Sequence, residues 1–274
     1  MILSLGSHSG AGLLSLVVAW VAMLAYGLAA LTGGGERRWP AVAWQLGWLA
    51  HGVALVIDFA ALDEPHGAGA RFGFAPVLSI TAWLVLTVHA IESRFVPLPQ
   101  VRRVLAALGA LVVLVAVIFP GEPHPLASSP WVPLHWMLGV ASYGLFGAAV
   151  LHASMLDSAD RQLRLKAGSA GTGPFGMPLL RLERLTFRFV DAGFVVLTAT
   201  LLLGAWSTAQ WHWSHKTVFS LLGWAVFAAL IVGRHLWGWR GRRATRWLYT
   251  GAVLLLLAYV GYRFVLEVLL HRSA

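Results

Sequence analysis

The residues of this chain that could do chemistry are its histidines and its aromatic side chains. There are 11 histidines, 14 tryptophans, 13 phenylalanines and 5 tyrosines, while the absence of cysteine excludes disulfides, thiolate metal sites and CxxC redox pairs. Neither the GxSxG elbow of hydrolases nor the HExxH and HxxEH patterns of zinc enzymes occur. Neutral imidazole is a good axial ligand for haem iron, and broad aromatic surfaces suit a porphyrin. The composition therefore allows a haem site, with interfacial aromatic belts and structural histidines as the alternative.

The composition of the whole chain is typical of a membrane protein. Hydrophobic residues make up 58% of it and charged residues only 11%, with a mean hydropathy of +0.74. A soluble domain is about 25% charged. The net charge is +9. In a membrane protein, lysine and arginine mainly set the orientation in the bilayer, so we do not interpret this charge as a nucleic-acid site and predict no such partner. Since residues 1–10 have no basic stretch and the first apolar run continues to Leu31, we expect no cleavable signal peptide.

Eight apolar runs have the length of about 20 residues that a helix needs to cross the hydrocarbon layer. They cover residues 9–31, 41–62, 74–93, 101–119, 132–155, 189–208, 217–237 and 246–269. A backbone exposed to lipid must satisfy its own hydrogen bonds, so each run is predicted to be helical. The predicted fold class is all-α: a polytopic membrane protein with eight transmembrane helices, forming a single integral-membrane domain over residues 1–274.

The basic residues predict how the spans are oriented. The loops that follow spans one, three, five and seven, together with the span ends that flank them, contain 16 of the 20 lysines and arginines, so we expect these loops in the cytoplasm and both termini outside. The longest of them is the cytoplasmic loop 156–188. Its last part, residues 179–189, alternates Leu or Phe with Arg. This pattern indicates either a basic amphipathic segment on the inner leaflet or a continuation of the sixth span into water.

Ionisable residues within spans are costly and are usually paired or functional. Three pairs of them share a helix face: His51 with Asp58, His89 with Glu92, and Arg263 with Glu267. We expect the last pair to form an ion pair near the end of the eighth span. A transporter has the least support, because no inverted repeat with broken helices is visible.

The histidines fall into groups by depth. The outer group comprises His135, His212, His215 and His271, His51 is central, and the inner group comprises His89, His152 and His235. For His152 we expect only an interfacial polar tip or plain exposure. His135 differs, because it follows Trp131 and precedes Gly139 and Gly144, which lie on a small-residue surface. That surface leaves room beside His135 for a flat ligand or a neighbouring helix.

Four segments carry a resemblance to a known family. They are WVPLHWMLGVASYGLFGAAVLHASM (131–155), the HK of SHKTVFSLLGW (214–224), GRHLWGWRGRRA (233–244) and AYVGYRFVLE (258–267). With these segments the chain resembles the CcsA/HemX-type cytochrome c assembly proteins, in particular their short stand-alone branch of the HemX or YpjD kind. The resemblance covers nearly the whole chain and implies a membrane-embedded core that binds haem b. It also implies a multi-pass protein of the bacterial inner (plasma) membrane.

In that family, a histidine at the outer start of one helix and another near the outer end of the last helix hold the iron. The resemblance carries the first position to His135, while the second falls one residue from His271. It also assigns Trp206, Trp211 and Trp213, with His212 and His215 beside them, to a tryptophan-rich loop that cradles the porphyrin. The family's histidine at the inner end of the following span corresponds to His235, and related short members carry a histidine in the span of His51.

The chain departs from the family in this loop, because Ser214-His215 replaces the part that contains an aspartate in the full motif. Two functions therefore stay open. The first is a haem-binding inner-membrane protein that assists cytochrome c assembly by presenting haem at the outer face, to apocytochrome c or with a CcsB-like membrane subunit. The second is a non-catalytic regulatory or accessory partner of another membrane protein, which keeps the fold without delivering haem. In neither case do we expect the chain to catalyse a reaction on its own.

Overall fold

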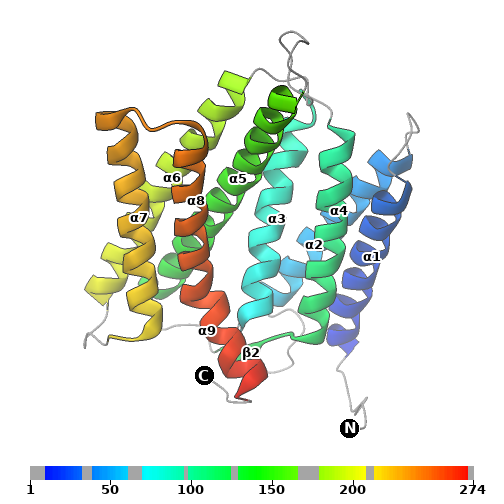
Figure 1. The fold of residues 1–274 in the computed structure, drawn as a ribbon. Helices are drawn as coiled ribbons and strands as arrows, with labels where there is room; N and C mark the ends of the chain where they lie inside the picture. The colour runs from blue at the N-terminus through cyan, green and yellow to red at the C-terminus, as the bar shows by residue number, and fades with distance from the viewer. Residues whose placement is uncertain are drawn as a thin grey trace. The chain divides into compact units, whose positions relative to one another are not determined.

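The computed structural model describes residues 10–32, 39–60, 70–95, 98–124, 129–165, 179–207 and 213–270. Within these ranges, eight helices are long and apolar enough to cross a membrane, which confirms the predicted all-α class with eight spans. Figure 1 shows the elements along the chain. They are α1 (Gly10–Thr32), α2 (Trp39–Phe59), β1 (Ala70–Phe72), α3 (Phe74–Glu92), α4 (Pro99–Ile118), β2 (Glu122–His124), α5 (Trp131–Leu165), α6 (Leu179–Ser207), α7 (His215–Trp237), α8 (Gly241–Leu256), η1 (Leu257–Gly261), α9 (Tyr262–Phe264) and η2 (Val265–Leu269).

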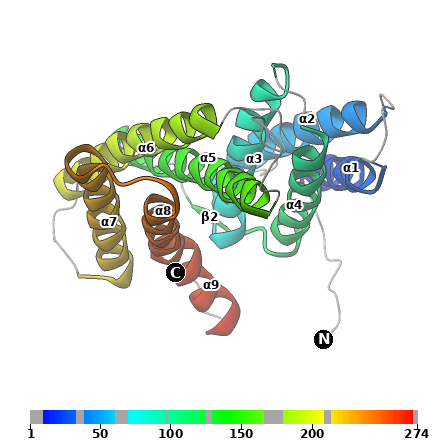
Figure 2. The same ribbon diagram turned by 45° about the horizontal axis from the view of Figure 1, so that its top comes forward.

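The chain divides into two compact units. The first contains Met1–Ala90 and Leu98–Ser128, and the second contains Ile91–Pro97 and Ser129–Arg272. In the first unit, α1 packs against both α2 and α4 (Figure 2). The ring of Tyr26 on α1 is fully buried at this contact. A Cβ at Gly47 of α2 would lie 2.7 Å from that ring, and one at Gly109 of α4 would lie 3.0 Å from it. Only glycines at these positions leave space for the tyrosine between the helices.

A short ribbon closes one end of the first unit. Strands β1 and β2 pair antiparallel, with Arg71 opposite Pro123. Gly121 precedes β2 with φ of +73°, a left-handed conformation that glycine adopts without strain. A Cβ there would lie 2.5 Å from the carbonyl oxygen of Phe72. The turn into the ribbon therefore requires glycine for two reasons, its backbone angle and the close approach of β1.

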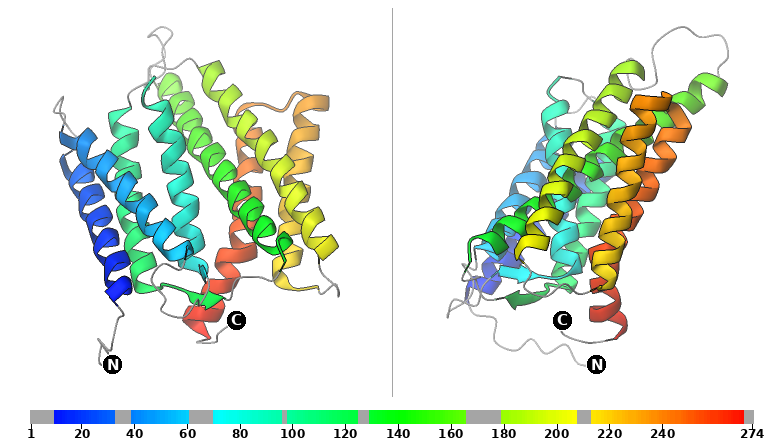
Figure 3. Two further views of the ribbon diagram at one scale, coloured as in Figure 1. Left: turned by 180° about the vertical axis from the view of Figure 1, so that it is seen from behind. Right: turned by 90° about the vertical axis from the view of Figure 1, so that its left-hand side faces the viewer.

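The second unit pairs α5 with α6 and α7 with α8, and α5 also contacts α8. Its core is apolar: Phe146 of α5 and Phe227 of α7 stack with ring centroids 3.8 Å apart, and both are buried. Ser214 caps the start of α7 by accepting a hydrogen bond from the Thr217 amide at 3.3 Å, and Gly238 ends it in the left-handed conformation. Figure 3 shows that the start of α5, the end of α6, the start of α7 and α9 lie at one end of this unit.

The predicted cytoplasmic loop 156–188 is in large part helical. Helix α5 continues ten residues past the predicted end of the fifth span, to Leu165, and α6 runs unbroken from Leu179 to Ser207. Residues 179–189 are therefore helical and continuous with the sixth span, as the second of the two alternatives requires. Polar side chains do not end α5, because they bond locally: Ser158 donates to the Ser154 carbonyl at 2.7 Å. Residues 166–178 lie outside the described part of the chain.

Candidate functional site

His135 lies in the second turn of α5 and faces α6. Its Nδ1 atom is 3.1 Å from the carbonyl oxygen of Thr200, and the side chain is partly exposed. One turn further along α6, Gly204 lies directly against the ring, since a Cβ there would be 2.8 Å from Cε1. Of the two occupants that the sequence allowed beside His135, the neighbouring helix is present. Gly204 is the residue that lets the ring and the helix approach each other.

The hydrogen bond to Thr200 fixes the protonation of the imidazole. A backbone carbonyl can only accept, so Nδ1 must carry the proton and donate it. In a neutral ring the lone pair then belongs to Nε2, which makes no hydrogen bond to another described residue. Metal-binding histidines usually have this arrangement, in which one ring nitrogen donates to a carbonyl and the other faces the metal. This geometry leaves Nε2, the nitrogen on the far side of the ring from Thr200, as the acceptor of His135.

Exposed aromatic side chains surround this end of the second unit. Trp131 of α5 and Trp206 of α6 contact each other with ring centroids 5.4 Å apart at 53°. Trp206 is 75% exposed and Trp213, just before α7, is 72% exposed. Indole rings at the end of a span are common where lipid meets water. They also offer flat apolar surface next to the free nitrogen of His135.

Two cations lie at the same end. Lys216, in the first turn of α7, has its Nζ 5.5 Å from the ring centroid of Tyr259, and the guanidinium of Arg263 lies 6.0 Å from the same ring. Lys216 is also close enough to His135 for its positive charge to interact electrostatically with the imidazole ring. Arg263 forms the expected ion pair with Glu267, at 3.6 Å. With two cations and one carboxylate, this group carries an excess positive charge in a place where it can attract an anion.

The last span is irregular where it carries these residues. Tyr259 lies in one π-helical turn, η1, and Glu267 lies in a second, η2. π-Helical turns are rare in proteins, and those that occur often lie at functional sites. The unusual backbone therefore coincides with the end of the unit that holds His135.

Most of the chain is similar to a known protein family. Residues 46–270, well over half of the chain, match the sequence model of the family described as Cytochrome C assembly protein. The chain belongs to this family. It is similar to Inner membrane protein YpjD of Escherichia coli (strain K12), with 28% identity over 242 residues that cover 86% of this chain and 89% of that protein. It is also similar to Cytochrome c biogenesis protein CcsA of Prochlorococcus marinus, with 23% identity over 69% of this chain and 70% of that protein. No solved structure matches.

The remaining site residues of this cytochrome c assembly protein are distributed unevenly. His215 is exposed at the start of α7, at the same end as His135. His235 is exposed at the other end of α7, 20 residues later, which is about 30 Å along a helix. The two histidines of α7 are thus not brought together. The predicted residues Trp211, His212 and His271 lie outside the described ranges.

His51 belongs to the first unit and is buried. Its Nε2 is 2.9 Å from the Ser79 hydroxyl of α3, and its ring meets the Tyr26 ring edge-on, with centroids 5.9 Å apart. Its Nδ1 has no hydrogen-bond partner among the described residues. Asp58, predicted on the same face, has a different partner: it accepts from the Ser15 hydroxyl at 2.6 Å.

The expectation for His152 was wrong. It is fully buried rather than a polar tip at the surface. Its Nδ1 donates to the Ala148 carbonyl at 2.7 Å, and its Nε2 lies 2.9 and 3.0 Å from the two carboxylate oxygens of Glu92. The partner is 60 residues away in sequence, so helix periodicity gave no sign of it. His89, which shares a helix face with Glu92, meets Trp44 edge-on, with ring centroids 5.6 Å apart.

Proposed function

We propose that this protein binds haem b at the His135 end of its second unit and assists cytochrome c assembly from the bacterial inner membrane. The observation that carries the proposal is the geometry of His135, whose Nδ1 donates to Thr200 and whose Nε2 is left for a metal. The family and the relatives named for cytochrome c biogenesis support it. The relative named an inner membrane protein and the eight apolar helices support the location.

The described residues fit such a ligand. Haem supplies an iron whose axial positions imidazole can fill. His135 would provide Nε2, held in the correct tautomer by Thr200, and Trp131 and Trp206 would cover the macrocycle with apolar surface. Lys216 and Arg263 would hold the two carboxylates of the porphyrin, because together they carry more positive charge than Glu267 offsets. His271, or His215 in its place, is the proposed second ligand.

We propose further that this end lies on the outer face of the inner membrane, with both termini on that side. The distribution of arginine and lysine supports this orientation. It would present the bound ligand to apocytochrome c, alone or with a CcsB-like subunit. The alternative function is an accessory partner without haem. One observation favours it. The contacts of His135 with Thr200 and Gly204 also hold α5 against α6, so the histidine could have a purely structural role.

One experiment separates the two functions. The protein is purified in mild detergent, reconstituted with haem, and its absorption spectrum is recorded. We expect a Soret band that is lost in His135→Ala and kept in Leu134→Ala, a matched truncation of the exposed neighbour on the same helix. No Soret band in the unaltered protein, or a band unchanged in His135→Ala while the thermal unfolding midpoint falls, would support the accessory function instead.

A further inference from the structure

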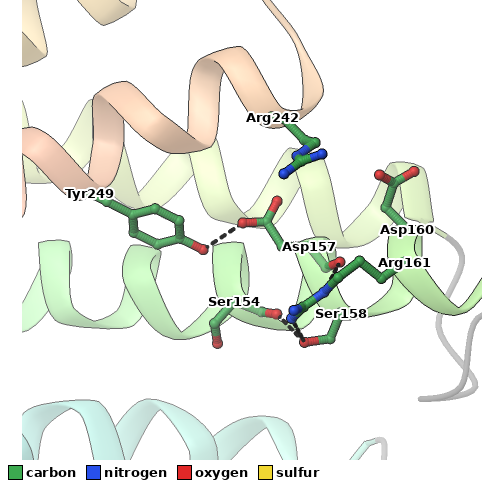
Figure 4. A pocket seen from close by; sticks show the side chains of 7 residues that line it. All are labelled: Ser154, Asp157, Ser158, Asp160, Arg161, Arg242 and Tyr249. Atoms are coloured by element: carbon green, nitrogen blue, oxygen red, sulfur yellow. Dashed lines mark hydrogen bonds between the residues drawn. The ribbon is translucent and has the colours of Figure 1, made fainter.

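A polar pocket lies at the other end of α5 from His135. It has a volume of about 330 Å³ and is enclosed by the last turns of α5 and the first turns of α8 (Figure 4). Two carboxylates, Asp157 and Asp160, and two guanidinium groups, Arg161 and Arg242, line it together with the hydroxyl of Tyr249. The lining is therefore charged but has no net charge. A ligand that matches it carries one positive and one negative group.

The charges of the pocket are held in different ways. Asp157 is fixed, since it accepts from the Thr245 hydroxyl at 3.1 Å and from the Tyr249 hydroxyl at 2.9 Å. Arg161 is partly engaged, donating to the Asp157 carbonyl at 3.3 Å. Arg242 is exposed and makes no hydrogen bond or ion pair with another described side chain. Its guanidinium leaves five N–H donors available at the mouth of the pocket.

The depth of the pocket points to a membrane component. The apolar span of α5 extends to Gln162, and that of α8 begins at Gly241. The pocket thus lies at the ends of these two apolar stretches, where lipid head groups are expected. From it, an exposed apolar stripe runs along the same face of α8 as Tyr249, toward the middle of the span. The stripe comprises Val253, Leu256 and Leu257, which are 56%, 46% and 39% exposed.

We propose that this pocket binds the head group of a zwitterionic phospholipid with a primary ammonium, as in phosphatidylethanolamine. Arg242 and Arg161 take the phosphate, and the carboxylates of Asp160 and Asp157 take the ammonium. The acyl chains lie on the apolar stripe of α8. An anionic phosphatidylglycerol has no ammonium, so it would leave the two carboxylates without a cation to offset them. A phosphatidylcholine has no N–H donor for Asp160.

The test is competition between lipids in native mass spectrometry of the detergent-purified full chain. Phosphatidylethanolamine, phosphatidylglycerol and phosphatidylcholine with identical acyl chains are added in equal amounts. We expect phosphatidylethanolamine to bind about tenfold better than either of the others, which corresponds to one charge-assisted hydrogen bond. Arg242→Gln should weaken the binding of all three lipids by about tenfold, because it removes a donor to the phosphate that they share. Arg246→Gln, at an exposed arginine one turn along α8 and outside the pocket, should leave lipid binding unchanged.

Two further arms decide the details. Asp160→Asn removes one of the two negative charges that face the ammonium. It should therefore reduce the preference for phosphatidylethanolamine over phosphatidylcholine and also over phosphatidylglycerol. Soluble phosphoethanolamine should bind at least about tenfold more weakly than the lipid, since it lacks the contact with α8. Equal binding of the three lipids, undiminished lipid binding in Arg242→Gln, or equally tight binding of soluble phosphoethanolamine would each overturn the proposal.

Discussion

Gly204 offers the sharpest perturbation of the His135 site, because a single methyl group can move the ring. In Gly204→Ala, the new Cβ would lie 2.8 Å from Cε1 and 3.3 Å from Nδ1 of His135. Carbon atoms rest about 3.5 Å apart, so the ring must retreat by about 0.7 Å. Thr200 is one turn away on the same face of α6, so this retreat also lengthens the 3.1 Å hydrogen bond to its carbonyl to about 3.8 Å.

The loss of that bond has a definite consequence if His135 ligates iron. Without the carbonyl, the tautomer and the orientation of the ring are no longer fixed. Removing such a supporting partner typically lowers metal affinity by about 10- to 100-fold. We therefore expect haem affinity to fall by this factor in Gly204→Ala, equivalent to about 1.4–2.7 kcal/mol. The variant should still fold, since alanine favours a helix by up to about 1 kcal/mol over glycine.

The assay is a haem titration followed at the Soret band, and the chain offers a matched control. Gly139 lies on α5 at the same contact between helices, but a Cβ there would be 3.8 Å from the Thr200 methyl, an ordinary distance. Gly139→Ala makes the same chemical change without moving His135 and should bind haem like the unaltered protein. Equal affinities in both variants, whether both normal or both reduced, would refute the reasoning that links Gly204 to the iron ligand.

Three other predictions concern orientation, the carboxylate-binding cations and stability. The chain has no native cysteine, so a single introduced cysteine can be labelled specifically. With the proposed orientation, Ser207→Cys should react with an impermeant maleimide in intact cells and Arg240→Cys only after permeabilisation, whereas the reverse pattern would invert the orientation. Lys216→Met should reduce the preference for haem over haem dimethyl ester by about tenfold without shifting the Soret band, while an equal affinity of the unaltered protein for both would exclude carboxylate recognition. Glu92→Ala leaves the buried His152 without its carboxylate partner and should lower the free energy of unfolding by about 1–3 kcal/mol. Glu92→Gln can still accept a hydrogen bond from the ring and should lower it less. Equal thermal midpoints of the two variants and the unaltered protein would argue against a stabilising His152–Glu92 contact.

The helices of this protein could be predicted from sequence because one constraint determines them. A chain that crosses lipid must bond its backbone internally, so each apolar run of about 20 residues becomes a helix. The same constraint does not act outside the bilayer. The extension of α5 beyond residue 155 and the ribbon of β1 and β2 were therefore not predicted. Their formation depends on local side-chain bonds and on the turn at Gly121, which apolar runs do not report.

The side-chain partners were the part that sequence could not give. Periodicity predicts which residues share a face of one helix, and Arg263 with Glu267 was predicted in this way. The partners of His135 and His152 lie 65 and 60 residues away, so only the packing of two helices brings them together. A signal for the first existed in the small residues of α6. Thr200 and Gly204 are one turn apart, a spacing that marks a face where another helix can approach closely.

The interior of the second unit limits how a ligand can reach His135. Between the His135 end and the polar pocket lies the stacked pair Phe146 and Phe227, with 2% and 0% of their surfaces exposed. A core packed to this density has no space for a porphyrin, and opening it would require separating α5 from α7. A ligand at His135 must therefore arrive from the side, through the bilayer, or from the water at that end. Trp131, Trp206 and Trp213 are exposed rings at this entrance, so a porphyrin that binds His135 as proposed would meet this aromatic surface as it arrives.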